Sequence, residues 1–206
     1  MTGAVLAGGE SRRMGRDKAF LEVGGQRIID RTLAVLGRLF TKLLIVTNSP
    51  ADYAYLGVRM VCDLLPGRGA LGGLYTALFF CTTPRAFVVA CDMPLLKAEV
   101  IGHLVAQPGK WDVVVPQMGD HVEPLHAVYS RKCLPHIEDL LERGGRKVTD
   151  FYPRVRVRRV PEEEIRTLDP WLLSFRNVNT PQEVEAILDI TRRVGVLQGP
   201  QPGGSA

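Results

Sequence analysis

The stretch that decides the fold lies at the start of the chain and reads Gly3-Ala4-Val5-Leu6-Ala7-Gly8-Gly9-Glu10-Ser11-Arg12-Arg13-Met14-Gly15-Arg16-Asp17-Lys18. Its first residues form a short apolar run typical of a buried strand, and a glycine-rich, basic loop follows at once. In an open parallel sheet, ligands bind at the carboxyl ends of the strands. We therefore expect a ligand site in the loop from Leu6 to Lys18.

Further short apolar runs, bounded by Gly, Pro or Asp, follow this first strand along the chain. They are Leu43–Val46, Val58–Cys62, Phe87–Ala90 and Val113–Val115. Amphipathic stretches of helical length separate them, namely Arg27–Leu39, Leu71–Phe80, Lys97–Val105 and Arg131–Leu141. Alternating strands and helices predict an α/β fold of three layers, a mostly parallel sheet with helices on both faces.

The alternation becomes irregular in the second half of the chain. Val122–Ser130 and Val155–Val160 are candidate strands, and we expect them to pair antiparallel as a lid over one side. Thr180-Pro181-Gln182-Glu183 predicts the capping box and first-turn proline of a last helix that runs to Ile190. We interpret residues 1–194 as one domain, with its C-terminal half binding a second substrate, and residues 195–206 as a disordered, Pro/Gly-rich tail.

Composition narrows the class of protein. The 206 residues are 46% hydrophobic and 23% charged, which suits a globular chain without a signal peptide or membrane span, so we expect a cytoplasmic protein with no membrane partner. The scattered cysteines Cys62, Cys81, Cys91 and Cys133 favour buried thiols over a metal site or disulfides. The net charge is +4, and the basic run 154–159 alternates with valine and lacks aromatic residues, so no nucleic-acid partner is expected.

The glycine-rich loop has the chemistry of a phosphate site. Gly8 and Gly9 lack side chains, so we expect a backbone with positive φ that brings N–H donors to phosphate oxygens, with Arg13 and Lys18 neutralising charge. The GxxxxGK[ST] and GxGxxG patterns are absent, which argues against P-loop enzymes and dinucleotide-dependent dehydrogenases. An ordinary glycine turn with solvated arginines is the alternative.

Polar residues follow three other predicted strands. Asp92, after Phe87–Ala90, is the candidate ligand for Mg²⁺, although Pro94 also fits a turn or a helix cap at this point. Asp63 and Asn48 follow their strands in the same way, and the Asn48 amide can bond a base or ribose; an ordinary turn is the alternative for each. A second glycine segment, residues 67–74 with Gly72, leads into a helix whose N-terminal amides can face the ligand.

Residues Leu6 to Lys18 resemble, without a gap, the signature of the molybdenum cofactor guanylyltransferases, Leu-Ala-Gly-Gly-x-Ser-x-Arg-Met-Gly-x-Asp-Lys. The matching elements continue at 91–94, 123–129 and 177–181, so that the resemblance runs to Glu183. It implies a Rossmann-like fold of the nucleotide-diphospho-sugar-transferase kind. Ala70 stands where this family usually has proline, which leaves the base-recognition loop without a fixed φ.

The resemblance implies a role for each candidate residue. The nucleotide-binding set is Leu6, Ala7, Gly8, Gly9, Lys18, Asn48, Asp63, Gly72 and Asp92; the catalytic set is Arg13, Lys18 and Asp92, with Asp92 holding Mg²⁺; and Asn177 and Asn179 border the acceptor. By itself, Asn179 is also typical of a helix cap. His126 lies in an apolar strand and is expected to be a core residue rather than a base.

The implied reaction transfers GMP from Mg–GTP to molybdopterin or the molybdenum cofactor, which gives molybdopterin guanine dinucleotide and pyrophosphate. Its nucleophile is already anionic, so positioning and charge neutralisation carry the rate. One alternative keeps the mechanism but uses CTP, as a molybdopterin cytidylyltransferase, or another phosphorylated cofactor precursor. Another is a non-catalytic carrier of molybdopterin or nucleotide. A maturation protein that inserts the cofactor into a molybdoenzyme is a further expected partner.

Overall fold

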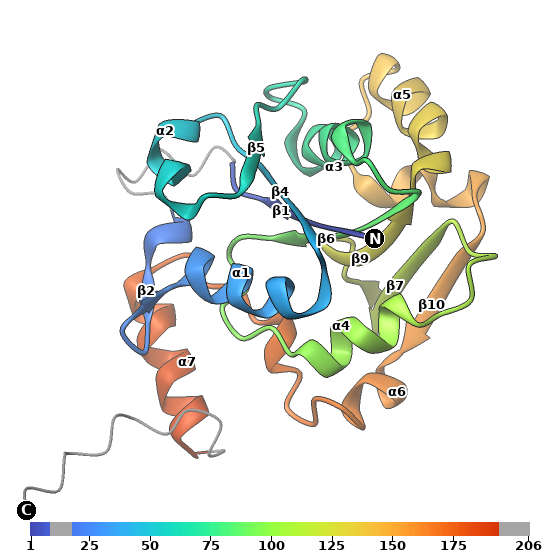
Figure 1. The fold of residues 1–206 in the computed structure, drawn as a ribbon. Helices are drawn as coiled ribbons and strands as arrows, with labels where there is room; N and C mark the ends of the chain where they lie inside the picture. Colours follow the sequence, from blue (N-terminus) through green and yellow to red (C-terminus); the bar gives the residue numbers. More distant parts are fainter. Residues whose placement is uncertain (9–17, 194–206) are drawn as a thin grey trace, which may run out of the picture.

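The computed structural model describes residues 1–8 and 18–193, and its centre is one eight-stranded sheet (Figure 1). The strands in spatial order are β10 (Val157–Pro161), β7 (Val113–Met118), β9 (His126–Ser130), β6 (Arg85–Ala90), β1 (Thr2–Leu6), β4 (Lys42–Val46) and β5 (Arg59–Val61), with β8 (His121–Val122) paired to β7. β1 is buried at every position, as expected of a strand covered on both faces.

Most strands of this sheet run in one direction. β1 pairs in parallel with β4 and with β6, β4 pairs in parallel with β5, and β7 pairs in parallel with β10. β9 is antiparallel to both of its neighbours, so β7 has the same direction as β6. The carboxyl ends of β1, β4, β5 and β6 therefore meet at one edge of the sheet.

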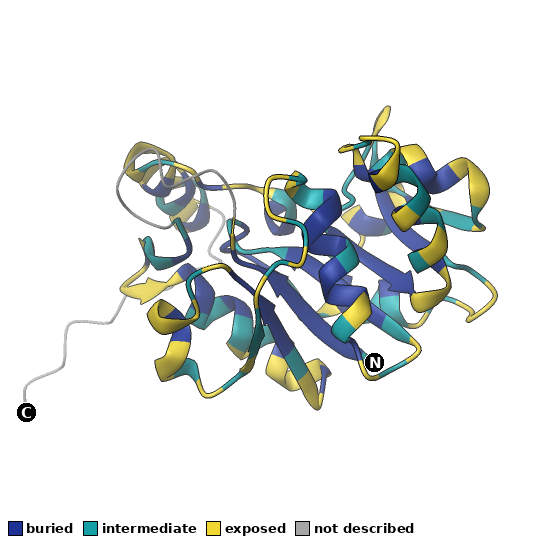
Figure 2. Cartoon of the chain, turned by 90° about the horizontal axis from the view of Figure 1, so that it is seen from above, coloured by how far each residue is buried: buried dark blue, intermediate teal, exposed yellow. Residues whose placement is uncertain are grey.

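Helices cover both faces, which confirms the predicted three-layer α/β fold. α3 (Gly69–Phe80) and α5 (Leu134–Glu142) pack on the face of Ala4 and Leu6, whereas α1 (Ile28–Leu39) and α4 (Ala98–Val105) pack on the face of Val5. Alternate residues of one strand thus enter opposite cores. Figure 2 shows the buried strands between helices whose outer surfaces are exposed.

The predicted antiparallel lid is wrong. His126–Ser130, the second part of the predicted Val122–Ser130 strand, lies inside the main sheet between β6 and β7, and β10 lies at the sheet's far edge in parallel with β7. All five residues of β9 are buried, and such a strand gains more apolar contact in a central position than in a solvated lid. β8 alone forms a hairpin with β7, which turns at Gly119 with φ of 56°.

A third, smaller core joins the C-terminal helix to the start of the chain. α7 (Pro181–Arg193) presents Val184 and Ile187 to Val23 of the hairpin formed by β2 (Glu22–Val23) and β3 (Gln26–Arg27). The predicted capping box is present: the Thr180 hydroxyl accepts the Glu183 N–H at 3.2 Å, and the Glu183 carboxylate accepts the Thr180 N–H at 3.0 Å. α7 is therefore fixed at its first turn.

The burial of the cysteines and of His126 agrees in part with the sequence predictions. Cys81 and Cys133 are buried as predicted, but Cys62 is exposed because β5 is an edge strand, and Cys91 is only half-buried. His126 is fully buried between Phe87 and Phe175, as expected of a core residue. No helix in the described ranges is long and apolar enough to cross a membrane. The expected tail, 195–206, lies outside the described residues.

Candidate active site

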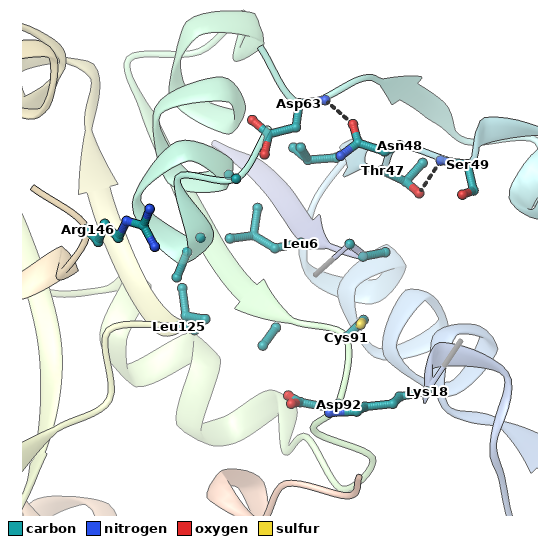
Figure 3. Close-up of a pocket in the computed structure, with 18 residues that line it drawn as sticks. Leu6, Lys18, Thr47, Asn48, Ser49, Asp63, Cys91, Asp92, Leu125 and Arg146 are labelled. Atoms are coloured by element: carbon teal, nitrogen blue, oxygen red, sulfur yellow. Dashed lines mark hydrogen bonds between the residues drawn. The ribbon is translucent and has the colours of Figure 1, made fainter. Parts of the chain in front are cut away.

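A cleft of about 630 Å³ opens at the carboxyl edge of the sheet (Figure 3). It lies over the ends of β1, β4 and β6 and the first turn of α3. The lining residues are Leu6, Ala7, Gly8, Lys18, Val46, Thr47, Asn48, Ser49, Asp63, Gly67, Gly69, Ala70, Gly73, Ala90, Cys91, Asp92, Leu125 and Arg146. This cavity therefore brings together Asp92 and six of the other predicted nucleotide-binding residues.

The end of β1 forms the floor of this cleft. Ala7 N–H donates to the Val46 oxygen at 2.9 Å, and Cys91 N–H donates to the Leu6 oxygen at 3.1 Å. Gly8 does not use the positive φ that is open to glycine, and a Cβ there would make only ordinary contacts with residues 47 and 48. Gly9 and Arg13, two further predicted site residues, lie outside the described residues.

Lys18 and Asp92 lie together on one side of the cleft (Figure 3). Lys18 is the first residue of a 3-10 turn, Lys18–Phe20, and its Nζ donates to Oδ1 of Asn179 at 2.6 Å. Asp92 follows the end of β6, and its main-chain oxygen accepts the Val178 N–H at 2.8 Å. The segment with Val178 and Asn179 thus contacts both members of the predicted catalytic pair, Lys18 and Asp92, although all three segments are far apart in the sequence.

The Asp92 carboxyl is largely withdrawn from solvent. This burial raises its pKa above the ordinary value, while the nearby Lys18 ammonium opposes the rise. Its Oδ1 atom is buried and has no hydrogen-bond partner among the described residues. A buried carboxylate oxygen without a partner is costly unless a ligand satisfies it.

This arrangement fits a single magnesium ion. The described residues contain no cluster of three or more His, Cys, Asp or Glu side chains that would enclose a metal. Mg²⁺ usually keeps several waters and binds through one or two carboxylates together with substrate phosphates. Asp92 supplies one such carboxylate beside an open cleft.

Asn48 and Asp63 lie across the cleft from Asp92 (Figure 3). Oδ1 of Asn48 accepts the Asp63 N–H at 3.0 Å, and among the described residues the Asn48 amino group has no hydrogen-bond partner, so it is available to a ligand. Oδ1 of Asp63 accepts the Thr76 hydroxyl at 2.9 Å and the Leu65 N–H at 3.1 Å. Asp63 is therefore both a loop-ordering residue and a wall of the cleft.

The second glycine segment brings the N-terminus of α3 to the cleft. Gly67 and Gly69 have φ of 82° and 61°, which glycine adopts without strain. Gly72, a predicted nucleotide contact, is buried and does not line the cleft; a Cβ there would lie 2.9 Å from the Leu65 oxygen. Its neighbour Gly73 lines the cleft instead, and a Cβ on Gly73 would lie 3.2 Å from Leu6.

The sequence reasoning missed Arg146, which lies at the opposite wall from Lys18 (Figure 3). It belongs to the turn Gly144-Gly145-Arg146-Lys147 after α5, where Gly144 has φ of 82° and a Cβ on Gly145 would overlap Leu140. The pair of glycines directly before two basic residues was the available signal.

Arg146 also lines a second cavity of about 850 Å³ beside the first, and Ala70 and Leu125 line both. The second cavity carries further basic side chains, Lys147 and Arg159, together with His121. Neither Asn177 nor Asn179, the predicted acceptor contacts, lines either of these cavities; both are exposed, and Asn179 contacts Lys18.

Comparison with known proteins identifies the family. A family model described as the MobA-like NTP transferase domain matches residues 3–157. A probable molybdenum cofactor guanylyltransferase of Pelotomaculum thermopropionicum is 44% identical, with 89% of each chain covered, and the molybdenum cofactor guanylyltransferase of Desulfosudis oleivorans is 41% identical, with 90% of this chain and 93% of that one covered. The chain belongs to the molybdenum cofactor guanylyltransferase family.

Solved structures agree with membership in the guanylyltransferase family. The crystal structure of molybdopterin-guanine dinucleotide biosynthesis protein A from Archaeoglobus fulgidus superposes with a TM-score of 0.79 at 30% identity, and the match covers 94% of this chain and all of that one. The 2-C-methyl-D-erythritol 4-phosphate cytidylyltransferase of Thermus thermophilus has a TM-score of 0.65 at 15% identity, which shows a shared fold alone.

Proposed function

We propose that this chain transfers GMP from Mg–GTP to the terminal phosphate of molybdopterin or the molybdenum cofactor. The products are molybdopterin guanine dinucleotide and pyrophosphate. Relatives at 44% and 41% identity carry the name of this activity, and they match over about nine-tenths of the chain. The observation that carries the proposal is that Asp92 lines the cleft with Lys18, and that its buried Oδ1 has no hydrogen-bond partner among the described residues.

The nucleotide lies along the carboxyl edge of the sheet in this proposal. Lys18 contacts the phosphates, and the first-turn amides of α3 and the Gly8 N–H, just past the end of β1, supply further donors. Arg13 and Gly9 complete the phosphate loop from outside the described residues. The base lies near Asn48 and Asp63, where an acceptor oxygen of Asp63 suits the N1 and N2 donors of guanine.

The transfer exchanges one phosphoanhydride bond for another. An oxygen of the acceptor phosphate bonds to the α-phosphorus, the bond from that phosphorus to the bridging oxygen breaks, and pyrophosphate leaves with the electron pair. Asp92 would hold a magnesium ion, and that ion would supply positive charge to neutralise the leaving pyrophosphate. Lys18 stabilises the same charge, and no side chain has to remove a proton.

We assign residues 1–194 to one domain. The acceptor binds in the C-terminal half of this domain. Arg146 lines both cavities, so it can bind the acceptor phosphate close to the nucleotide. The basic residues Lys147 and Arg159 line the second cavity, which suits a polyanionic ligand. Asn177 and Asn179 line neither cavity, so in this proposal they reach only a part of the acceptor that extends beyond the second cavity to the Lys18 side of the cleft.

Pyrophosphate release tests the proposal. Purified protein with Mg²⁺ is given GTP, CTP or ATP, with and without molybdopterin, and Asp92→Ala is measured in parallel. Release that requires both GTP and molybdopterin and is lost in the variant supports the proposal. Release with CTP instead would assign a cytidylyltransferase, and tight binding without release would assign a carrier.

A further inference from the structure

We propose that Asn179 is a positioning residue that acts through Lys18: it holds the lysine ammonium at the nucleotide cleft before the substrate arrives. The inference rests on the proposed nucleotide site. The contact that carries it is the 2.6 Å hydrogen bond from Lys18 Nζ to Asn179 Oδ1, which joins residues 161 positions apart. Asn179 lines neither of the two cavities, whereas Lys18 lines the cleft.

A lysine needs such a partner because its side chain has four rotatable bonds. Binding a phosphate orders this chain, and the entropy loss opposes binding unless the side chain is ordered beforehand. The ammonium has three donors, so the bond to Asn179 leaves two for phosphate oxygens. Lys18 can therefore bind Asn179 and a phosphate at the same time. The hydrogen bond to Asn179, here called the tether, lowers the entropy cost of binding the phosphate.

Asn179 is itself held rigidly. Its N–H and that of Thr180 both donate to the Glu183 carboxylate, inside the capping box of α7. The preceding residue, Val178, is fully buried in the third core and donates its N–H to the Asp92 oxygen at 2.8 Å. Two consecutive residues thus contact the loops that carry Asp92 and Lys18, and they set the separation of these two groups.

A double-mutant cycle tests the inference. The dissociation constant for Mg–GTP is measured without acceptor for the wild type, Asn179→Ala, Lys18→Ala and the double variant. We expect Asn179→Ala to weaken binding about fivefold, as for loss of one hydrogen bond to a charged group near the surface. In the Lys18→Ala background the same change should alter binding by less than about twofold, because the residue through which Asn179 acts is gone.

Controls separate positioning from folding. Gln182→Ala removes an exposed amide from the next turn and should leave the dissociation constant unchanged. Asn179→Gln keeps the amide oxygen on a longer side chain and should restore part of the lost affinity. The ¹⁵N NMR order parameter of the Lys18 ammonium should fall in Asn179→Ala. The order parameter of the Lys42 ammonium, which donates to Thr82 elsewhere in the protein, should not change.

The alternatives give different results. Equal effects of Asn179→Ala in both backgrounds would overturn the inference, because Asn179 would then act independently of Lys18. Unchanged nucleotide affinity with a raised KM for molybdopterin would also overturn it and assign Asn179 to the acceptor alone. If CTP binds in place of GTP, the cycle is run with CTP, so failure of the proposed substrate is read separately from failure of the tether.

Discussion

The side-chain oxygen of Asn48 accepts the backbone N–H of Asp63 at 3.0 Å, so the second residue after β4 fixes the second residue after β5. These strands are parallel neighbours, and their carboxyl ends therefore lie side by side. Asp63 in turn accepts the Thr76 hydroxyl of α3. One chain of hydrogen bonds thus links two loops and a helix at the wall of the nucleotide cleft.

Replacement of Asn48 by alanine should weaken GTP binding. The change removes both the acceptor for Asp63 N–H and an amino donor at the cleft, each worth about 1 kcal/mol, so we expect a rise in the dissociation constant of about tenfold or more. Isothermal titration calorimetry measures it. A dissociation constant within twofold of the wild-type value would show that this wall does not contact the nucleotide.

Replacement of Asp92 by asparagine should abolish turnover without lowering stability. Burial raises the Asp92 pKa, so its ionised form destabilises the fold: the stability it contributes is present at acid pH and is lost as the pH rises through the folded-state pKa. At neutral pH the variant should therefore unfold at the same or a higher temperature. Mn²⁺ binding in the presence of GTP, followed by electron paramagnetic resonance, should be lost. A variant that keeps this signal would contradict Asp92 as the ligand.

His126 should make the fold sensitive to mild acid. Burial lowers its pKa from 6.5 to about 3, so the stability it contributes is present above pH 6.5 and is lost as the pH falls towards 3. Each pH unit within this window costs up to about 1.4 kcal/mol. His126→Phe keeps the aromatic contacts with Phe87 and Phe175 and should flatten this slope. Urea unfolding at pH 7, 6, 5 and 4 compares the two proteins, and equal slopes would contradict the assignment.

A methyl group at Gly72 should disturb the nucleotide loop. A Cβ there would lie 2.9 Å from the Leu65 oxygen, which is backbone and has to move, so we expect Gly72→Ala to cost about 1–3 kcal/mol and to weaken GTP binding. Gly102→Ala is the matched control, because that helical glycine has open space around it and the change should stabilise α4 by up to about 1 kcal/mol. Thermal unfolding reports both effects.

Replacement of Arg146 by alanine should raise the KM for molybdopterin about tenfold or more, because a charged hydrogen bond to the acceptor phosphate is worth about 1.5–3 kcal/mol. GTP affinity should change less. Arg143 ends α5 just before the turn that carries Arg146 and pairs with Asp139 on the surface, so Arg143→Ala should leave both constants unchanged. Equal losses for both arginines would contradict a specific role for Arg146.

The gathering of the candidate nucleotide-binding residues in one cleft could be predicted from the sequence because these residues lie at strand ends. Leu6 ends a parallel strand, and Asn48, Asp63 and Asp92 each follow one. Parallel strands bring such positions to one edge whatever the side-chain details. The family signature added the residue roles.

The acceptor half could not be predicted in the same way. The alternation of Val122–Ser130 fits a lid strand as well as a central strand, and only packing against β6 and β7 decides between them. Arg146 reaches the cleft from a turn after α5, and Asn179 reaches Lys18 from the start of α7. Contacts across 161 residues leave no periodic signal in a single sequence.

The position of β9 has a consequence during synthesis on the ribosome. Until residues 126–130 emerge, the hydrogen-bonding groups along one edge of β6 have no partner strand, although β1 already covers the other edge. Such an open edge can pair with a strand of another nascent chain, which is a route to aggregation. Translation stalled before Ser130 should therefore produce chains that depend on chaperones, whereas chains released after β10 have closed this edge and joined the two halves of the enzyme.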